Sequence, residues 1–226
     1  MKPLLAQSLA NILHSWQEER EELISLLQPG LSSEEIEQQC SKLPFHLPRE
    51  AYSLYQWRDG ILVPNFYFLD FNIDFLPQFR FLSLAEAVNQ YQEVEEFRQE
   101  YRSFAKNCPS HSDEHCQKPW FPIFDGNESG YLVVLGDENL QECSPILNIC
   151  WKSDEIVKLE YHNLTQMMSV IAECYETGAY YLEVEMIDRH VVEFLVENRH
   201  KVAQIKRKHN LEKLGVRLKK HLRRMR

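Results

Sequence analysis

The segment Leu43–Gly60 reads LPFHLPREAYSLYQWRDG and combines an early proline, an aromatic helix face and a closing glycine. Pro48 suits the first turn of a helix, where its missing N–H costs nothing. Gly60 suits the position just past a helix end, where a positive φ is needed. The residues between them fall on one face at helical spacing, flanked by Tyr52 and Trp57: Ala51, Leu54, Tyr55 and Arg58. We therefore predict a short helix over 49–59, followed by strand-like sequence.

Two helices are predicted before this segment. Apolar residues at helical spacing indicate an amphipathic first helix over 5–27, which the pair Pro29-Gly30 ends. Ser32 and Glu35 have the spacing of a capping box, so a second helix is expected over 33–40.

Further helices are predicted after it. Ser83 and Glu86 have capping-box spacing and open a helix to about residue 106. Asn163 caps a helix that runs through residue 177, where Gly178 closes it. From about Ile187 the chain is predicted to form one or two helices.

The strand candidates lie between the helices. Residues 61–82 are rich in aromatic residues and are interrupted by turn residues, so two or three short strands are expected there. Short connections, which suit an antiparallel meander, separate four more candidates: 120–124, 131–135, 146–150 and 156–161. Helices gathered before and after a meander indicate the α+β class, a mostly antiparallel sheet with helices packed on one side.

Three stretches resemble the SMI1/KNR4 (SUKH) family. Residues 36–60, IEQQCSKLPFHLPREAYSLYQWRDG, resemble its opening helix and its "LP-x-x-y-x-x-L-y-x-x-x-x-G" segment. Residues 81–87, FLSLAEA, resemble its "l-ls-l-e-e-a" segment, and residues 120–178 are similar to its core around "W-l-P-i-f-d-g-x-x-x-G-y-l". One departure is that Tyr131 directly follows Gly130, where the family often has an aspartate.

The resemblance implies a SMI1/KNR4-like fold and a protein that binds another protein without catalysis. The implied partners are a cognate toxin, for bacterial immunity proteins, or cell-wall and signalling factors, for fungal members. On this basis residues 31–185 form the SMI1/KNR4-like domain. Residues 1–30 are an added helix packed on it, and residues 186–226 are a basic helical extension.

Composition favours an ordinary globular chain. The 226 residues are 44% hydrophobic and 26% charged, and no apolar run reaches the length of about 18 residues that a transmembrane helix needs. The N-terminus shows no small-residue cleavage site, so no signal peptide is expected. Six cysteines are too few for a disulfide scaffold, which favours a cytoplasmic location with reduced thiols.

Charge is distributed unevenly along the chain. Residues 199–226 hold 12 Lys or Arg and one Glu, within a total of 25 basic and 34 acidic residues. The remainder is therefore strongly acidic and is suited to a basic partner.

No catalytic set is visible in the sequence. It has no G-x-S-x-G, no glycine-rich phosphate loop and no H-E-x-x-H, and its helical carboxylate pairs are typical of solvated faces. The one dense group of soft ligands lies within nine residues and fits no usual zinc pattern: Cys108, His111, His115 and Cys116. We expect a solvated loop with reduced thiols there, no bound metal and no cofactor. A structural metal or a Cys108–Cys116 disulfide is the less favoured alternative.

Two segments are candidates for binding. The turn after the first meander strand could present Asp125, Asn127, Glu128 and Tyr131 to a partner, although such residues are also ordinary turn formers. The C-terminal segment has leucines at helical spacing, including Leu211, Leu214 and Leu218, surrounded by basic residues: Lys213, Arg217, Lys219, Lys220, Arg223 and Arg224.

This basic amphipathic segment could bind nucleic acid or an anionic membrane, dock on an acidic protein, or lie against the acidic body of its own chain. We favour the last, with the three leucines buried. The predicted function is a non-enzymatic protein-binding module of the SMI1/KNR4 type, either an immunity protein that neutralises a toxin or a regulator of cell-wall or signalling processes. The alternative is a nucleic-acid or anionic-membrane binder that acts through the tail.

Overall fold

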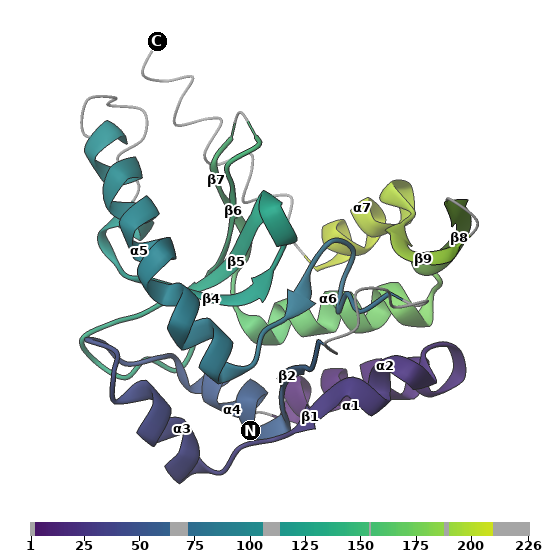
Figure 1. Cartoon of the computed structure of the whole chain (residues 1–226), viewed down its shortest axis with the longest axis horizontal. Coiled ribbons are helices and arrows are strands. Elements are labelled where there is room, and N and C mark those ends of the chain that lie inside the picture. Colours follow the sequence, from purple (N-terminus) through teal and green to yellow (C-terminus); the bar gives the residue numbers. More distant parts are fainter. Residues whose placement is uncertain (1–2, 64–71, 106–113, 154, 188–189, 210–226) are drawn as a thin grey trace.

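A five-stranded antiparallel sheet forms the centre of the computed structural model, which describes residues 3–63, 72–105, 114–153, 155–187 and 190–209 (Figure 1). Each strand pairs with the next in the order β3-β4-β5-β6-β7. The predicted α+β class and the antiparallel meander are confirmed. The strands are β3 (Arg80–Phe81), β4 (Trp120–Asp125), β5 (Gly130–Leu135), β6 (Ile146–Cys150) and β7 (Val157–Tyr161).

The central strands are apolar on both faces. All six residues of β5 are buried. Their partners in register are apolar as well, with Val133 opposite Leu147 and Leu147 opposite Leu159. A strand that is buried along its whole length needs cover on both faces. The expectation that the helices lie on one side is therefore wrong.

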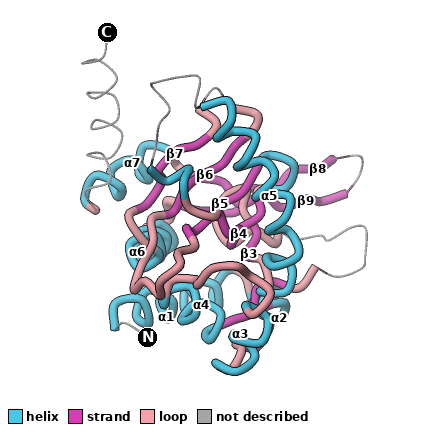
Figure 2. Tube along the Cα trace, turned by 90° about the vertical axis from the view of Figure 1, so that its left-hand side faces the viewer, coloured by secondary structure: helices cyan, strands magenta, loops and turns pink. Residues whose placement is uncertain are grey.

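Helix α5 (Leu84–Ala105) covers one face of the sheet (Figure 2). Its Tyr101 ring lies 6.0 Å from the ring of Trp120 in β4. Trp151, just after β6, makes edge-on contacts with Phe97 of α5 at 5.0 Å and with Tyr131 of β5 at 5.6 Å. These aromatic contacts fix α5 across three strands.

Three helices cover the opposite face. Phe124 of β4 lies 5.3 Å from both Phe75 and Phe81. Tyr55 stacks on Phe81 at 5.6 Å, and Trp16 meets Phe75 edge-on at 5.0 Å, so helices from distant parts of the chain share one core. These helices are α1 (Pro3–Glu19), α4 (Arg49–Trp57) and α6 (Leu164–Glu176).

The N-terminal segment, predicted as one helix over 5–27, is two helices and a strand. The chain leaves the helical conformation at Arg20, with φ −143° and ψ 48°. The buried Arg20 guanidinium donates hydrogen bonds to the carbonyl oxygens of Asp74 and Asn72, both at 2.7 Å. A buried guanidinium needs such acceptors, and they come from a distant segment. The pieces after α1 are α2 (Glu21–Leu26) and β1 (Leu27–Pro29), which pairs with β2 (Arg58–Ile61).

The predicted helix starts are confirmed. At α3 (Ser33–Cys40), Ser32 and Glu35 form a reciprocal capping box. At α5, the Ser83 N–H donates to Glu86 at 2.9 Å and the Glu86 N–H donates to the Ser83 Oγ at 3.2 Å. The Asn163 side chain caps α6. Each cap is local in sequence, which is why the pattern alone located it.

The two glycines predicted to close helices differ. Gly178 lies just past α6 with φ +61°, as expected. Gly60 also has a positive φ, +77°, but it lies inside β2 and does not close α4. Helix α4 ends at Trp57 because Arg58 is already extended and begins the strand that pairs with β1.

Residues 190–197 are a strand, so the prediction of helices from Ile187 is wrong there. β8 (Tyr180–Ile187) and β9 (His190–Glu197) form an antiparallel hairpin of eight paired positions. The β-branched valines of residues 190–197 and the alternation of apolar with polar residues in β8 favour strands once the two segments can pair. Helix α7 (Arg199–Lys208) follows, capped by Asn198. In its described part, the predicted basic extension over 186–226 is therefore a hairpin strand followed by a basic helix.

Candidate functional site

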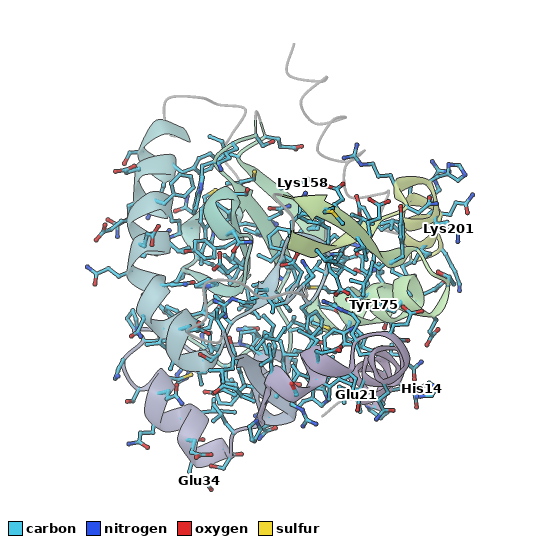
Figure 3. The ribbon with its side chains drawn as sticks, turned by 45° about the vertical axis from the view of Figure 1, so that its right-hand side comes forward. His14, Glu21, Glu34, Lys158, Tyr175 and Lys201 are labelled. Atoms are coloured by element: carbon cyan, nitrogen blue, oxygen red, sulfur yellow. The ribbon has the colours of Figure 1, made fainter. Side chains whose placement is uncertain are left out.

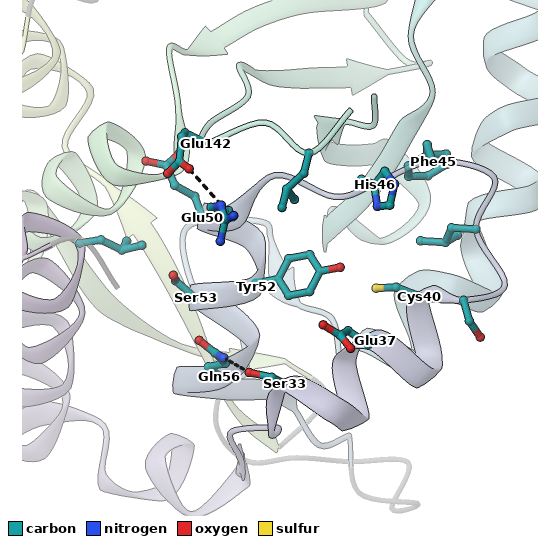
Figure 4. A pocket seen from close by; sticks show the side chains of 15 residues that line it. Ser33, Glu37, Cys40, Phe45, His46, Glu50, Tyr52, Ser53, Gln56 and Glu142 are labelled. Carbon is teal, nitrogen blue, oxygen red and sulfur yellow. Dashed lines mark hydrogen bonds and ion pairs between the residues drawn. The ribbon is translucent and has the colours of Figure 1, made fainter. Parts of the chain in front are cut away.

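An open groove with a volume of about 820 Å³ lies between α3, α4 and the 137–142 loop (Figure 4). We call it the α3–α4 groove. Leu5 and Phe45 line its base and are buried, whereas Leu140 at the rim is 44% exposed. Tyr52, half-buried on α4, presents its ring to the groove. The groove therefore offers an apolar and aromatic surface that solvent reaches.

The walls of the groove are fixed by backbone contacts. The Leu31 N–H donates to the Tyr55 carbonyl at 2.9 Å and ties the start of α3 to α4. The N–H of Arg49, in the first turn of α4, donates to the carbonyl of Gln141 at 2.9 Å, and the N–H of Glu50 donates to that of Glu142 at 3.3 Å. The first N–H groups of a helix have no partner within the helix. The 137–142 loop supplies those partners and is held against α4.

The rim of the groove is acidic. Glu37 on α3 and Glu142 on the loop are both exposed. The Arg49 Nε lies 3.0 Å from the Glu142 Oε1, but both side chains are more than half exposed, so this pair contributes little stability and can open. Burial raises the pKa of Tyr52, and Cys40 and Glu37 raise it further, so the hydroxyl stays a proton donor at neutral pH.

Glu50 is the one buried carboxylate of the groove, and it is engaged in structure. It is 2% exposed and accepts hydrogen bonds from the Leu164 N–H at 3.2 Å and the Thr165 Oγ1 at 2.5 Å. These donors form the N-terminus of α6, where a negative charge is stabilising. Glu50 therefore locks α4 to α6.

The groove is poorly equipped for nucleophilic chemistry. Burial raises the pKa of the Cys40 thiol to about 11, so it carries almost no thiolate at neutral pH. The Ser33 Oγ accepts a hydrogen bond from Gln56 at 2.9 Å. Among the described residues, the exposed His46 hydrogen-bonds neither Cys40 nor a groove serine through its ring. Among the described residues, Cys40 and Ser33 are therefore poor nucleophiles in this conformation.

Cys40 is expected to resist alkylation in the folded protein. At about pH 8, a thiol with a pKa of about 11 is ionised in roughly one molecule in a thousand. Cys143, which is exposed, serves as the internal control. We expect iodoacetamide followed by peptide mapping to label Cys143 readily and to label Cys40 only in denaturant. Equal labelling of both in the native protein would contradict this and would make Cys40 a candidate nucleophile.

The turn predicted to bind a partner lies at the opposite end of β5 from the groove. The first carboxylate of the turn, Asp125, shares the buried Arg80 with Glu86. The Arg80 Nη2 lies 3.8 Å from the Asp125 Oδ2, and its Nη1 lies 3.1 Å from the Glu86 Oε1. Burial raises the pKa of Asp125, and Arg80 opposes that shift. Asn127 is exposed with φ +52°, as in a tight turn.

Of the other two predicted turn residues, Tyr131 is only 7% exposed and packs on Trp151, so it offers little surface to a partner. Glu128 lies in a short 3-10 turn, Asn127–Ser129. The structure thus uses the buried members of this turn for the fold. A role for its exposed members in binding stays a prediction.

The predicted cysteine–histidine loop lies partly outside the described residues, which exclude Cys108 and His111. The Cys116 carbonyl accepts a hydrogen bond from Arg98 at 2.7 Å, and the His115 carbonyl accepts one from Trp120 at 3.0 Å. The described part of the chain contains no group of three side chains placed to hold a metal ion. The expectation that the full loop binds no metal stays a prediction.

The basic tail is described only as far as residue 209, and this part docks on the acidic body as predicted. Val202 and Ile205 of α7 are buried. The Lys206 Nζ lies 2.5 Å from the Glu160 Oε1, and the Lys208 Nζ lies 2.9 Å from the Glu173 Oε1. Figure 3 shows Lys201 on α7 at the surface. The three leucines and six basic residues predicted to act in the tail lie outside the described residues: Leu211, Leu214, Leu218, Lys213, Arg217, Lys219, Lys220, Arg223 and Arg224.

No family model matches the sequence, and no curated protein is significantly similar to it. The resemblance to the SMI1/KNR4 family therefore stays a prediction. Within the described ranges, no helix has both the length and the apolar character needed to cross a bilayer.

The sequence pattern pointed to the turn at 125–131 and did not identify the groove. The groove combines α3, α4 and the 137–142 loop, which are separated in sequence. The signals in the sequence were Leu140 among polar neighbours and the two prolines before α4, Pro44 and Pro48, neither of which specifies binding by itself.

Proposed function

We propose that this protein is a non-enzymatic binding module whose α3–α4 groove receives a protruding segment of a basic protein partner. The observation that carries the proposal is the groove itself, which is open, apolar at its base and acidic at its rim. Concave sites with an apolar lining and a few polar groups are the usual places for ligand binding.

Charge and aromatic character favour a basic partner. A lysine or arginine side chain over the Tyr52 ring gains a cation–π contact, and Glu37 lies near that ring in the groove. Glu142 lines the same groove from the loop side. The chain carries 34 acidic and 25 basic residues, and 12 of the basic ones lie in residues 199–226. An acidic body attracts a basic protein over a distance and speeds its association.

The resemblance to the SMI1/KNR4 family suggests what such a partner is. A cognate toxin would fit an immunity role, and a cell-wall or signalling protein would fit a regulatory one. The alternative, a nucleic-acid or anionic-membrane binder acting through residues 213–224, remains a second hypothesis. It is less favoured because Lys206 and Lys208 of the same basic segment pair with the chain's own glutamates.

The experiment is affinity capture from the organism's own lysate, with and without nuclease treatment, followed by titration of the captured protein. Reversing charge at Glu37→Lys and Glu142→Lys is expected to weaken binding about tenfold or more, because it replaces attraction with repulsion at the rim. The matched control is Glu93→Lys with Glu100→Lys on the exposed side of α5, which makes the same change of charge away from the groove. Thermal melts establish that both variants fold.

Three results would overturn the proposal. The first is equal binding by the groove variant and the wild-type protein. The second is capture that nuclease abolishes, which would favour the nucleic-acid hypothesis. The third is chemical conversion of the captured partner by the purified protein, which would make the chain an enzyme.

A further inference from the structure

The hairpin of β8 and β9 forms a sheet of its own, separate from the five-stranded sheet. It projects from the end of the molecule opposite α5 (Figure 1). Its base is anchored, since Tyr180 and Leu195 are buried and the Asn198 N–H donates to the Ala179 carbonyl at 2.8 Å. Toward its tip the hairpin is open to solvent.

The open part of the hairpin carries apolar side chains. Val184 is 61% exposed, Met186 is 77% exposed and Val191 is 49% exposed. Met186 lies directly opposite Val191, and Val184 is two residues along the same face, so the three form one patch. Single exposed apolar residues are common on proteins, but a cluster rimmed by charges marks an interaction site.

The outer edges of the hairpin are unpaired within the part of the chain that the structure describes. Among the described residues neither strand pairs with a third, and each has eight residues, longer than the usual strand of about five or six. Natural edge strands are commonly protected by lysine, proline or a bulge. Residues 180–187 and 190–197 contain no lysine or proline, and their register is uninterrupted.

Of the two edges, β8 is the accessible one. Residues 183–186 are all exposed, whereas β9 includes the buried Leu195 and the half-buried Val192, Glu193 and Val196. A strand of eight residues offers an edge about 27 Å long. This edge can pair with one extended segment.

Charge indicates which kind of segment fits. Every Asp, Glu, Lys or Arg in the paired positions of the hairpin is a glutamate: Glu183, Glu185, Glu193 and Glu197. A second copy of this hairpin would place like charges side by side, which is destabilising. An extended segment with lysine or arginine at alternate positions would instead pair its charges with Glu183 and Glu185.

We propose that the outer edge of β8 binds an extended basic segment of a partner protein, which adds to the hairpin as a third strand. Main-chain hydrogen bonds give such strand addition its affinity, and alternate side chains give it specificity. The residues of β8 and β9 alone support this proposal, so it does not depend on the α3–α4 groove.

The test uses a fluorescently labelled eight-residue peptide of alternating lysine and valine, titrated into the full chain and followed by anisotropy. We expect saturable binding that becomes about tenfold weaker or more with Glu183→Lys and Glu185→Lys. The control pair Glu93→Lys and Glu100→Lys on α5 is expected to leave binding unchanged. A peptide N-methylated at alternate residues, which keeps its charge but loses main-chain donors, is expected to lose binding.

Several outcomes would overturn the proposal. Equal binding of the N-methylated peptide, or equal weakening by the α5 control, would mean general charge attraction without strand addition. Binding only by a chain that ends at residue 209 would assign the edge to the chain's own tail. Loss of peptide binding with the groove variant Glu37→Lys and Glu142→Lys would place the peptide in the groove, so failure of this proposal is distinguishable from failure of the proposed function.

Discussion

Replacing Gly60 with alanine is expected to lower the free energy of unfolding by about 3–5 kcal/mol. Gly60 has φ +77°, which L-residues with a side chain rarely adopt. An added Cβ would also lie 2.2 Å from the Ser83 backbone nitrogen and 2.5 Å from the Leu82 carbonyl carbon. These are backbone atoms at the start of α5, where Ser83 and Glu86 form the cap, so they cannot move aside without disturbing that cap.

Gly178→Ala is the matched control for this prediction. Its φ is +61°, but an added Cβ would meet no atom within 4 Å. Only the backbone penalty remains, and the expected loss is about 1 kcal/mol. Chemical denaturation of both variants measures the difference. Equal losses of unfolding free energy in the two variants would contradict the close approach of β2 to the start of α5.

Removing α7 is expected to produce the second large loss. A chain that ends at Asn198 loses the buried side chains of Val202 and Ile205, each of which stabilises by about 1.5–3 kcal/mol. The expected fall in the free energy of unfolding is therefore about 3–6 kcal/mol. The double variant Val202→Ala, Ile205→Ala in the full chain should reproduce much of this loss. The exposed pair Lys201→Ala, Gln204→Ala should not.

The loss has an electrostatic part with a defined pH dependence. Burial by itself raises the pKa of Glu160, but Lys206 and Lys158 outweigh it and hold that pKa below its ordinary value. A carboxylate with a lowered folded-state pKa stabilises the protein above its unfolded pKa, and this contribution disappears as the pH falls through the folded-state pKa. The stability difference between the full chain and the chain ending at Asn198 should therefore shrink in acid. A difference that is constant from neutral to acidic pH would contradict the role of the Glu160 ion pairs.

Shortening the chain to residue 209 tests the predicted burial of Leu211, Leu214 and Leu218. If these leucines pack on the acidic body, this shorter truncation also lowers stability by several kcal/mol, at about 1.5–3 kcal/mol for each leucine. An unchanged melting temperature, together with salt-sensitive binding of the full chain to DNA, RNA or anionic vesicles, would favour the tail as a binding arm.

Much of the fold follows from signals that lie within a few residues of each other. The Ser32–Glu35 and Ser83–Glu86 pairs define helix starts because both partners of each capping box lie within one turn. The meander over 120–161 was predictable because its strands are short, apolar and joined by tight connections, so each pairs with its neighbour in sequence. The acidic body and basic tail also follow from the sequence alone.

What only the tertiary structure decided depends on partners far away in the chain. The helix breaks at Arg20 because the carbonyls of Asn72 and Asp74 accept hydrogen bonds from its buried guanidinium. Residues 190–197 suit more than one secondary structure, and pairing with β8 made them a strand. Gly60 is needed because β2 passes against the start of α5, a contact that the residues around Gly60 do not encode. The α3–α4 groove and the open β8 edge arise in the same way, because local sequence specifies where an element begins, whereas long-range packing decides which of its faces stays exposed.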